Sequence, residues 1–381
     1  MGTDAWRNWR AFQAGQAELE NFDDELQSDV PFVGGPASFG PYTLSTVIRD
    51  SDTVGPAIAL HAGIHTNLIP EVVVEGKLAE SDSSAYHGGS MTDEIAALVS
   101  LELGVRLRLA GTTRLSGIHD ERDSARAPIL FEVPRLTRPG RPGREQIPAA
   151  VARRADVAAL RRLSMFAEIN EIAQVELVRA ARSYAAALWW ANEDPNQAWL
   201  QFVTAVETAA TCRQRLTAEP IDLLREHWPE LWNELQHGSE RARTRIASVL
   251  AEQTKATRKF IDFLTECAPE PPDERMEYGQ LDWSKMRRHI SVIYGHRSKA
   301  LHTGKPFPMP MLSEPRRDNS GTFQEIPWGL NSGGLGGVWK ASETPMLLST
   351  FEYITRGALL RWWDELTSAA SAVAGPATLL D

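Results

Sequence analysis

The residues with the clearest chemical potential lie together in the stretch YGHRSKALHTG, from Tyr294 to Gly304. Arg297 and His302 are five residues apart in this stretch, which ends a run with helical periodicity. A guanidinium can hold a phosphate and stabilise negative charge that develops on it, and an imidazole can donate or accept a proton near neutral pH. These residue types therefore suggest acid–base chemistry on a phosphate group.

The surrounding pattern predicts a helix through LDWSKMRRHISVIYGHRSKALHT. At about 100° per residue, Arg297 falls in the middle of an apolar stripe. The members of this stripe are Met286, Ile290, Ile293, Tyr294 and Leu301. Burial of an unpaired guanidinium is costly, so Arg297 needs either a carboxylate partner or a pocket that admits an anion. His302 lies about 140° round the helix from Arg297 and about 7.5 Å further along it, so both side chains could reach one phosphate.

The end of this helix is marked by two residues that follow His302. Gly304 suits the left-handed position after a helix, and Pro306 prevents continuation. An imidazole in the last turn lies at the negative end of the helix dipole, which favours its protonated form. The alternative without catalysis is a histidine that caps the helix and an arginine in a salt bridge between helices.

The hexapeptide Arg297-Ser298-Lys299-Ala300-Leu301-His302 matches the R-x4-6-H signature and resembles the HEPN superfamily of helical-bundle ribonucleases and nucleotide-binding modules. The context agrees, because the motif occurs late in a helical region and follows two long helices that contain YAAALWWANEDPNQAWLQFVTAVETAA. The arrangement looks like bacterial HEPN proteins of the defence-associated type. The resemblance extends from Ala149 to the C-terminus.

This resemblance implies a metal-independent endoribonuclease that needs no cofactor and forms its site across a homodimer. His302 would act as general base or acid at the ribose 2′-hydroxyl or the leaving 5′-oxygen, and Arg297 would hold the scissile phosphate. Ser298 would hydrogen-bond the phosphate or orient His302. Glu207, at the edge of the apolar face of an earlier helix, is the expected partner of Arg297. The expected RNA contacts are Arg288, Tyr294, Lys299 and Lys305, with packing the preferred role for Tyr294.

A second hypothesis keeps the same motif for structure alone. The chain would then be a non-catalytic HEPN module that serves as a dimerisation or nucleotide-binding scaffold. On the catalytic hypothesis, the resemblance implies bacterial anti-phage defence or a toxin system. The N-terminal half would sense a phage- or nucleotide-derived trigger or bind a partner.

Length and charge set broad limits on these hypotheses. The 381 residues are enough for two domains, and the net charge of −10 argues against a protein that coats nucleic acid indiscriminately. The segment from Leu281 to Lys305 is nevertheless basic. No apolar run has the length of a membrane span, the first residues lack the pattern of a secretory signal, and two cysteines suggest no zinc cage or disulfide framework. We therefore expect a cytoplasmic protein with no membrane partner.

The residue pattern changes along the chain. It predicts an α+β domain over residues 1–134, a linker over 135–148 and a HEPN-like helical bundle over 149–381, with helix dominant overall. Strand patterns occur in AIALHAGIH, EVVVEGKL and VRLRLAGTTRLSG, and a helix is expected from Met91 to Gly104 with Ser90 and Asp93 as a capping pair. The bundle should contain five or six helices, one of them broken near Pro229.

Three further features of the sequence lie outside the Arg297–His302 motif. His61 and His65, with Glu71, His87 or His119, are the residue types of a metal site, but nothing fixes such a geometry and we predict none. YHGGSMTDE could present backbone amides to an anion, although a turn and N-cap is the preferred interpretation. The long segment from Pro306 to Ser342 follows His302 directly and is expected to be a loop that could cover the catalytic groove.

Overall fold

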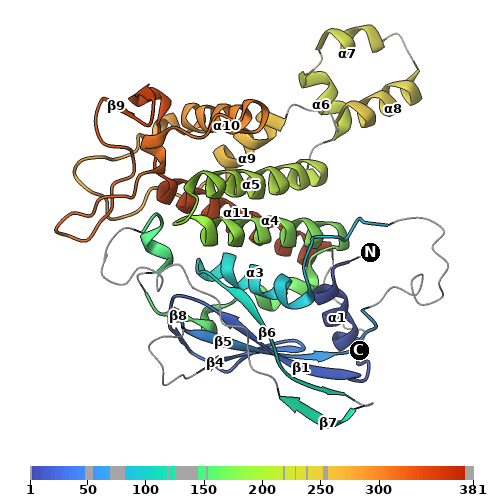
Figure 1. Ribbon diagram of the computed structural model, residues 1–381. Coiled ribbons are helices and arrows are strands. Elements are labelled where there is room, and N and C mark those ends of the chain that lie inside the picture. The colour runs from blue at the N-terminus through green and yellow to red at the C-terminus, as the bar shows by residue number, and fades with distance from the viewer. Residues whose placement is uncertain are drawn as a thin grey trace.

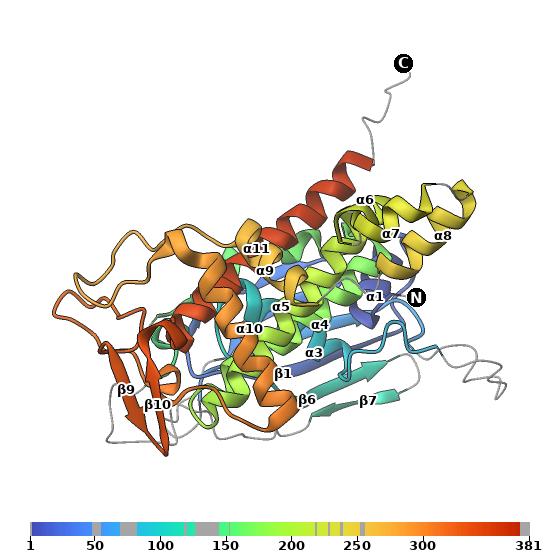
Figure 2. The ribbon, with the colours of Figure 1, turned by 90° about the horizontal axis from the view of Figure 1, so that it is seen from above.

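The computed structural model describes most of the chain, and Figures 1 and 2 show its elements from two sides. The described residues are 2–47, 55–68, 82–117, 120–125, 145–151, 153–217, 219–227, 229–236, 239–251 and 256–373. The predicted strand EVVVEGKL and most of the predicted linker, residues 135–144, lie outside them.

An antiparallel sheet of six strands lies on one side of the molecule, in the order β3-β4-β5-β1-β6-β7 (Figure 1). The strands are β1 (Glu20–Gln27), β3 (Ala37–Phe39), β4 (Tyr42–Val47), β5 (Ala57–Ile64), β6 (Arg108–Gly117) and β7 (Asp120–Ala125). Strands β5 and β6 confirm two of the predicted strands. Two short strands, β2 (Phe32–Val33) and β8 (Ala155–Asp156), pair in parallel outside this sheet.

Helices α1 (Asp4–Gln13) and α3 (Met91–Leu103) lie between the sheet and the helical part of the chain (Figure 1). The expected cap of α3 is present, because the side chains of Ser90 and Asp93 each accept a hydrogen bond from the other's backbone N–H. Gly104 ends the helix with a φ of 65°. Almost every residue of α3 is buried, since the helix is covered by other elements on all sides.

The second half of the chain is built from helices, as predicted. They are α4 (Glu171–Trp190), α5 (Pro195–Thr217), α6 (Pro220–His227), α7 (Pro229–Leu235), α8 (Glu240–Ala251), α9 (Ala256–Cys267), α10 (Met286–Thr303) and α11 (Leu348–Val373). The expected break falls at Pro229, the first residue of α7. Figure 1 places α6, α7 and α8 together at a corner far from the sheet. Among the described helices, none has the length and apolar character needed to cross a membrane.

One helix expected between Ser239 and Cys267 is found as two, α8 and α9, with residues 252–255 outside the described part of the chain. Short 3-10 helices connect several elements. They are η1 (Pro148–Ala150), η2 (Val157–Ala159), η3 (Leu163–Glu168), η4 (Trp283–Lys285), η5 (Met309–Leu312) and η6 (Ala341–Glu343).

A single hydrophobic cluster runs through both halves of the chain, from Ala5 to Leu366. In the bundle, the indole of Trp199 stacks between the rings of Phe307 and Phe351, with centroid distances of 5.1 and 4.7 Å. Trp362 and Trp363 are fully buried. The sheet and the bundle are therefore packed against each other through a shared core.

The segment after α10 contains regular secondary structure where a loop was expected. It contains η5 and a hairpin of β9 (Asn331–Gly334) and β10 (Gly337–Lys340), whose ends pair through Gly334 and Gly337. The two turn residues, Leu335 and Gly336, have φ values of 47° and 81°. Positive φ at both central positions suits a tight two-residue hairpin, which explains why the glycine-rich run can form one.

Candidate functional site

Helix α10 carries the Arg297–His302 motif and packs only its first part into the bundle. Ile290 and Ile293 are fully buried, whereas Leu301 is 53% exposed. The prediction that Leu301 belongs to the buried stripe is wrong, because the last turn of α10 projects beyond its neighbours and residues 301–306 are all exposed. Gly304 ends the helix in the left-handed conformation that was expected, with a φ of 67°.

Arg297 has the carboxylate partner that its position required. Its Nη2 donates a hydrogen bond of 2.7 Å to Oε2 of Glu207 on α5, and both side chains retain about a fifth of their exposure, 22% and 19%. The guanidinium carbon also lies 5.6 Å from the ring centroid of Tyr294. The predicted Arg297–Glu207 pair is therefore confirmed, and it holds the guanidinium at the edge of the bundle.

Tyr294 packs under this ion pair. Its side chain is 93% covered, and its ring centroid lies 5.1 Å from that of Phe260 on α9. Burial, followed by the nearby carboxylate of Glu207, raises the pKa of the Tyr294 hydroxyl. A phenol in this environment is neutral at physiological pH, which agrees with the preferred packing role.

His302 lies in a different environment from Arg297. It is exposed in the last turn of α10, and Ser298 is half-buried on the same helix. In the described part of the chain, no hydrogen bond, ion pair or ring contact joins Arg297 to His302. The two ends of the motif are thus both reachable from solvent, but one protomer does not bring them together by direct contact.

The predicted RNA-contacting residues divide into two groups along α10. Lys299 and Lys305 are exposed near His302. Arg288 is exposed near the start of the helix, beside a shallow hollow of about 470 Å³ that is also lined by Lys285 and Arg287. At 1.5 Å per residue, Arg288 lies about 21 Å along the helix axis from His302. It could therefore contact only a different part of an RNA strand.

The charge of this basic segment is partly neutralised by neighbouring carboxylates. Arg287 pairs with Asp262 at 3.0 Å, and Lys285 pairs with Asp282 at 2.6 Å. The hydrogen bonds from Lys285 and Ser284 lower the pKa of Asp282 to about 2. The positive charge available to an anion along α10 and just after it therefore comes mainly from Arg288, Lys299 and Lys305.

His296 is a residue of the motif region that the sequence analysis did not single out. Its Nε2 lies 2.7 Å from the backbone oxygen of Glu343, and its ring centroid is 6.0 Å from that of Phe307. Burial lowers the pKa of His296, so the neutral imidazole donates to the carbonyl. His296 thus attaches the segment after α10 to the helix that carries Arg297 and His302. A histidine next to Arg297 was the signal available in the sequence.

His61, His65 and His87 of the N-terminal half each contact polar groups of the protein itself. His61 forms a 2.7 Å pair with Asp23, and the described residues contain no group of three or more side chains suited to a metal ion. His119 and Glu71 lie outside the described residues. The prediction that these histidines form no metal site therefore stays a prediction.

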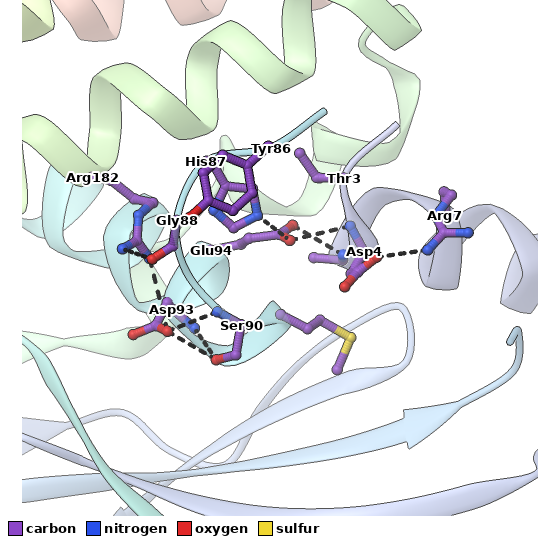
Figure 3. Close-up of polar contacts among 12 residues, drawn as sticks. Thr3, Asp4, Arg7, Tyr86, His87, Gly88, Ser90, Asp93, Glu94 and Arg182 are labelled. Atoms are coloured by element: carbon purple, nitrogen blue, oxygen red, sulfur yellow. Dashed lines mark hydrogen bonds and ion pairs between the residues drawn. The ribbon is translucent and has the colours of Figure 1, made fainter. Parts of the chain in front are cut away.

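The start of α3 is occupied by side chains of the protein, as the N-cap interpretation predicted. Figure 3 shows Ser90 and Asp93 in the capping box and Arg182 beside Gly88. Nearby, the buried Glu94 accepts a 2.8 Å hydrogen bond from Nε2 of His87 and bonds from the backbone N–H groups of Asp4 and Ala5 at the start of α1 (Figure 3). The backbone N–H groups of Ser90, Asp4 and Ala5 therefore already donate to carboxylates of the chain.

No protein-family model, curated protein or solved structure matches this chain. Its function must therefore be argued from the chemistry of the site rather than from the fold. Along α10 that chemistry consists of a carboxylate-held guanidinium, an exposed imidazole and several exposed cations. This set can bind an anion and transfer a proton.

Proposed function

We propose that this protein is a metal-independent endoribonuclease of the HEPN type. The observation that carries the proposal is the position of Arg297, which Glu207 holds at the bundle edge five residues before the exposed His302. A guanidinium and an imidazole at this spacing are the two groups that RNA cleavage without a metal needs.

The proposed reaction is an internal transfer at one phosphodiester of the RNA. The ribose 2′-oxygen forms a bond to phosphorus, the bond from phosphorus to the 5′-oxygen breaks, and a 2′,3′-cyclic phosphate remains. His302 accepts the 2′-hydroxyl proton or donates a proton to the leaving 5′-oxygen. Arg297 stabilises the charge on the phosphate, and Ser298 hydrogen-bonds that phosphate or orients His302.

The proposed active form is a homodimer in which the two motifs face each other. Arg297 and His302 of one protomer are not in contact, so a second copy can supply the complementary group at a shared phosphate. Exposed Lys299 and Lys305 extend the positive charge beside His302, and Arg288 would contact a more distant part of the strand. The proposed setting is the bacterial cytoplasm, in anti-phage defence or a toxin system, with a phage- or nucleotide-derived trigger acting on the N-terminal half.

The alternative is a non-catalytic HEPN scaffold for dimerisation or nucleotide binding. The observation that favours it is the Arg297–Glu207 ion pair itself, because this pair satisfies the guanidinium without any ligand. Under this alternative the motif stabilises the packing of α10 on α5.

Cleavage of a mixed RNA pool in the presence of EDTA separates the two functions. The wild-type protein should cleave RNA, and His302→Ala should reduce the rate by about 10²–10⁴-fold, as loss of a general acid or base does. His61→Ala, which removes another partly exposed histidine, should leave the rate unchanged. The scaffold alternative predicts no cleavage by the wild type, while Arg297→Ala lowers the midpoint of urea unfolding.

A further inference from the structure

A cavity of about 410 Å³ lies where the end of α3 meets α11 and the residues after η1. Its size falls within the range of small-molecule sites. The lining combines two arginines and a glutamate with apolar or small residues. The lining residues are Gly104, Ala149, Ala150, Arg153, Pro269, Glu352, Tyr353, Arg356 and Gly357.

Two guanidinium groups converge on this cavity over Gly104. A Cβ atom built on Gly104 would lie 2.7 Å from Nε of Arg356 and 3.2 Å from Nη2 of Arg153. Arg356 donates to the backbone oxygens of Leu101 and Glu102, and Arg153 donates to that of Leu103. The two cations are therefore held side by side at the last turn of α3, and a glycine leaves room for both.

The positive charge at this place exceeds the negative charge beside it, because Glu352 is the one carboxylate among the lining residues and acts electrostatically on both arginines. In the described part of the chain, neither Arg153 nor Arg356 forms an ion pair. The nearby Glu352 instead accepts a 2.5 Å hydrogen bond from the hydroxyl of Tyr184. Burial raises the pKa of Glu352, and burial together with the neighbouring Arg356 lowers that of Arg153. Arg153 is exposed and Arg356 is half-buried, so a ligand in solution can reach both, and one carboxylate for two guanidiniums leaves a net positive charge beside the cavity.

We propose that this cavity binds the phosphate group of a small organic molecule. A phosphate dianion matches two guanidiniums in charge, and arginine presents paired N–H donors with the geometry that phosphate oxygens accept. The contacts to α3 use only some of the N–H donors of each arginine. Pro269, Ala149 and the partly exposed Tyr353 provide apolar surface for the rest of the molecule. This site is separate from α10 and does not depend on RNA cleavage.

Calorimetric titration of the full-length protein with inorganic phosphate, pyrophosphate and adenosine monophosphate tests the proposal. We expect saturable binding of at least one of these probes, and roughly tenfold or greater weakening in Arg153→Gln and in Arg356→Gln. Arg225→Gln, a change of an exposed arginine on α6, should leave the affinity unchanged. Absence of binding by the wild type, or binding by both pocket variants that is as tight as that of the wild type, would overturn the proposal.

A second variant avoids loss of the arginine contacts to α3. Ala149→Glu places a carboxylate in the cavity at an exposed position, where it should pair with the arginines and abolish probe binding while the fold persists. Ala159→Glu introduces the same charge at an exposed position outside the cavity and should bind the probe like the wild type. Unchanged binding by Ala149→Glu, or tighter binding of citrate than of every phosphate probe, would show that the cavity is not a phosphate site.

Discussion

At the scale of single residues, Arg297 can satisfy both functional hypotheses with the same contacts. Its pair with Glu207 stabilises a partly buried cation. The same pair orients the guanidinium, and a fixed orientation is what phosphate binding would need. What distinguishes the hypotheses is His302, which has no structural partner in the described part of the chain and remains exposed. A purely structural motif gives no reason for a free imidazole at this position.

Glu352 provides a residue-scale prediction about pH. Because burial raises its pKa above the usual 4.5, ionisation of Glu352 opposes folding as the pH rises through the raised value. Glu352→Gln cannot ionise and can still accept the hydrogen bond from Tyr184. We expect the variant to have a higher free energy of unfolding than the wild type at pH 7, with the difference disappearing as the pH falls below about 4.5.

Urea unfolding at several pH values checks this prediction. Glu193→Gln, at an exposed position after α4, serves as the matched control and should show no pH-dependent difference. A wild-type protein that is more stable than Glu352→Gln at pH 7 would contradict the assigned effect of burial.

At the scale of elements, a buried ion pair connects the sheet to the bundle. Arg106, between α3 and β6, pairs with Asp29 at 2.6 Å and donates to the backbone oxygen of Leu188 on α4 at 2.7 Å. Both charged side chains are completely buried. We predict that Arg106→Ala lowers the free energy of unfolding by about 3–5 kcal/mol, because it leaves the Asp29 carboxylate buried without a partner.

A double variant separates the charge effect from the loss of packing. Arg106→Met with Asp29→Asn removes both charges while it keeps side chains of similar size, and it should cost less than Arg106→Ala alone. Both free energies come from urea unfolding followed by circular dichroism. An Arg106→Ala protein as stable as the wild type would rule out the proposed connection.

The elements also show which features a sequence can predict. The bounds of α3 follow from its capping pair and its glycine. A carboxylate partner was one of two ways to satisfy a half-buried arginine, and the family resemblance, with the place of Glu207 at the edge of an apolar face, pointed to Glu207. Leu301 was placed wrongly because helical periodicity assumes that neighbours cover the whole length of α10. The central strand β1 was missed because its sequence, ENFDDELQ, is rich in acidic residues. Asp24 is nevertheless buried there, where it accepts a hydrogen bond from Thr92 of α3.

The remaining features depend on contacts between distant positions. His296 gains its role from a backbone oxygen 47 residues later, and no local pattern reveals that contact. The arginine cavity likewise combines Gly104, Arg153 and Arg356, which have no relation in sequence spacing. Such sites arise from tertiary packing and can be recognised only in the folded chain.

At the scale of the whole molecule, the proposed catalytic unit is a pair of chains. We predict that the protein sediments as a homodimer at the concentration of the cleavage assay, because one protomer does not bring Arg297 and His302 into contact. Sedimentation velocity at several protein concentrations measures this directly. Full cleavage activity at a concentration where the protein is entirely monomeric would contradict the shared site.

The most direct test of the account is the chemistry of the RNA ends that the protein produces. With EDTA present, the wild type should generate fragments that end in a 2′,3′-cyclic phosphate and a 5′-hydroxyl, and His302→Ala should generate almost none. Fragments with the same ends at the same rate from His302→Ala would contradict the role of this imidazole. An intact RNA pool after incubation with the wild-type dimer would contradict the nuclease itself.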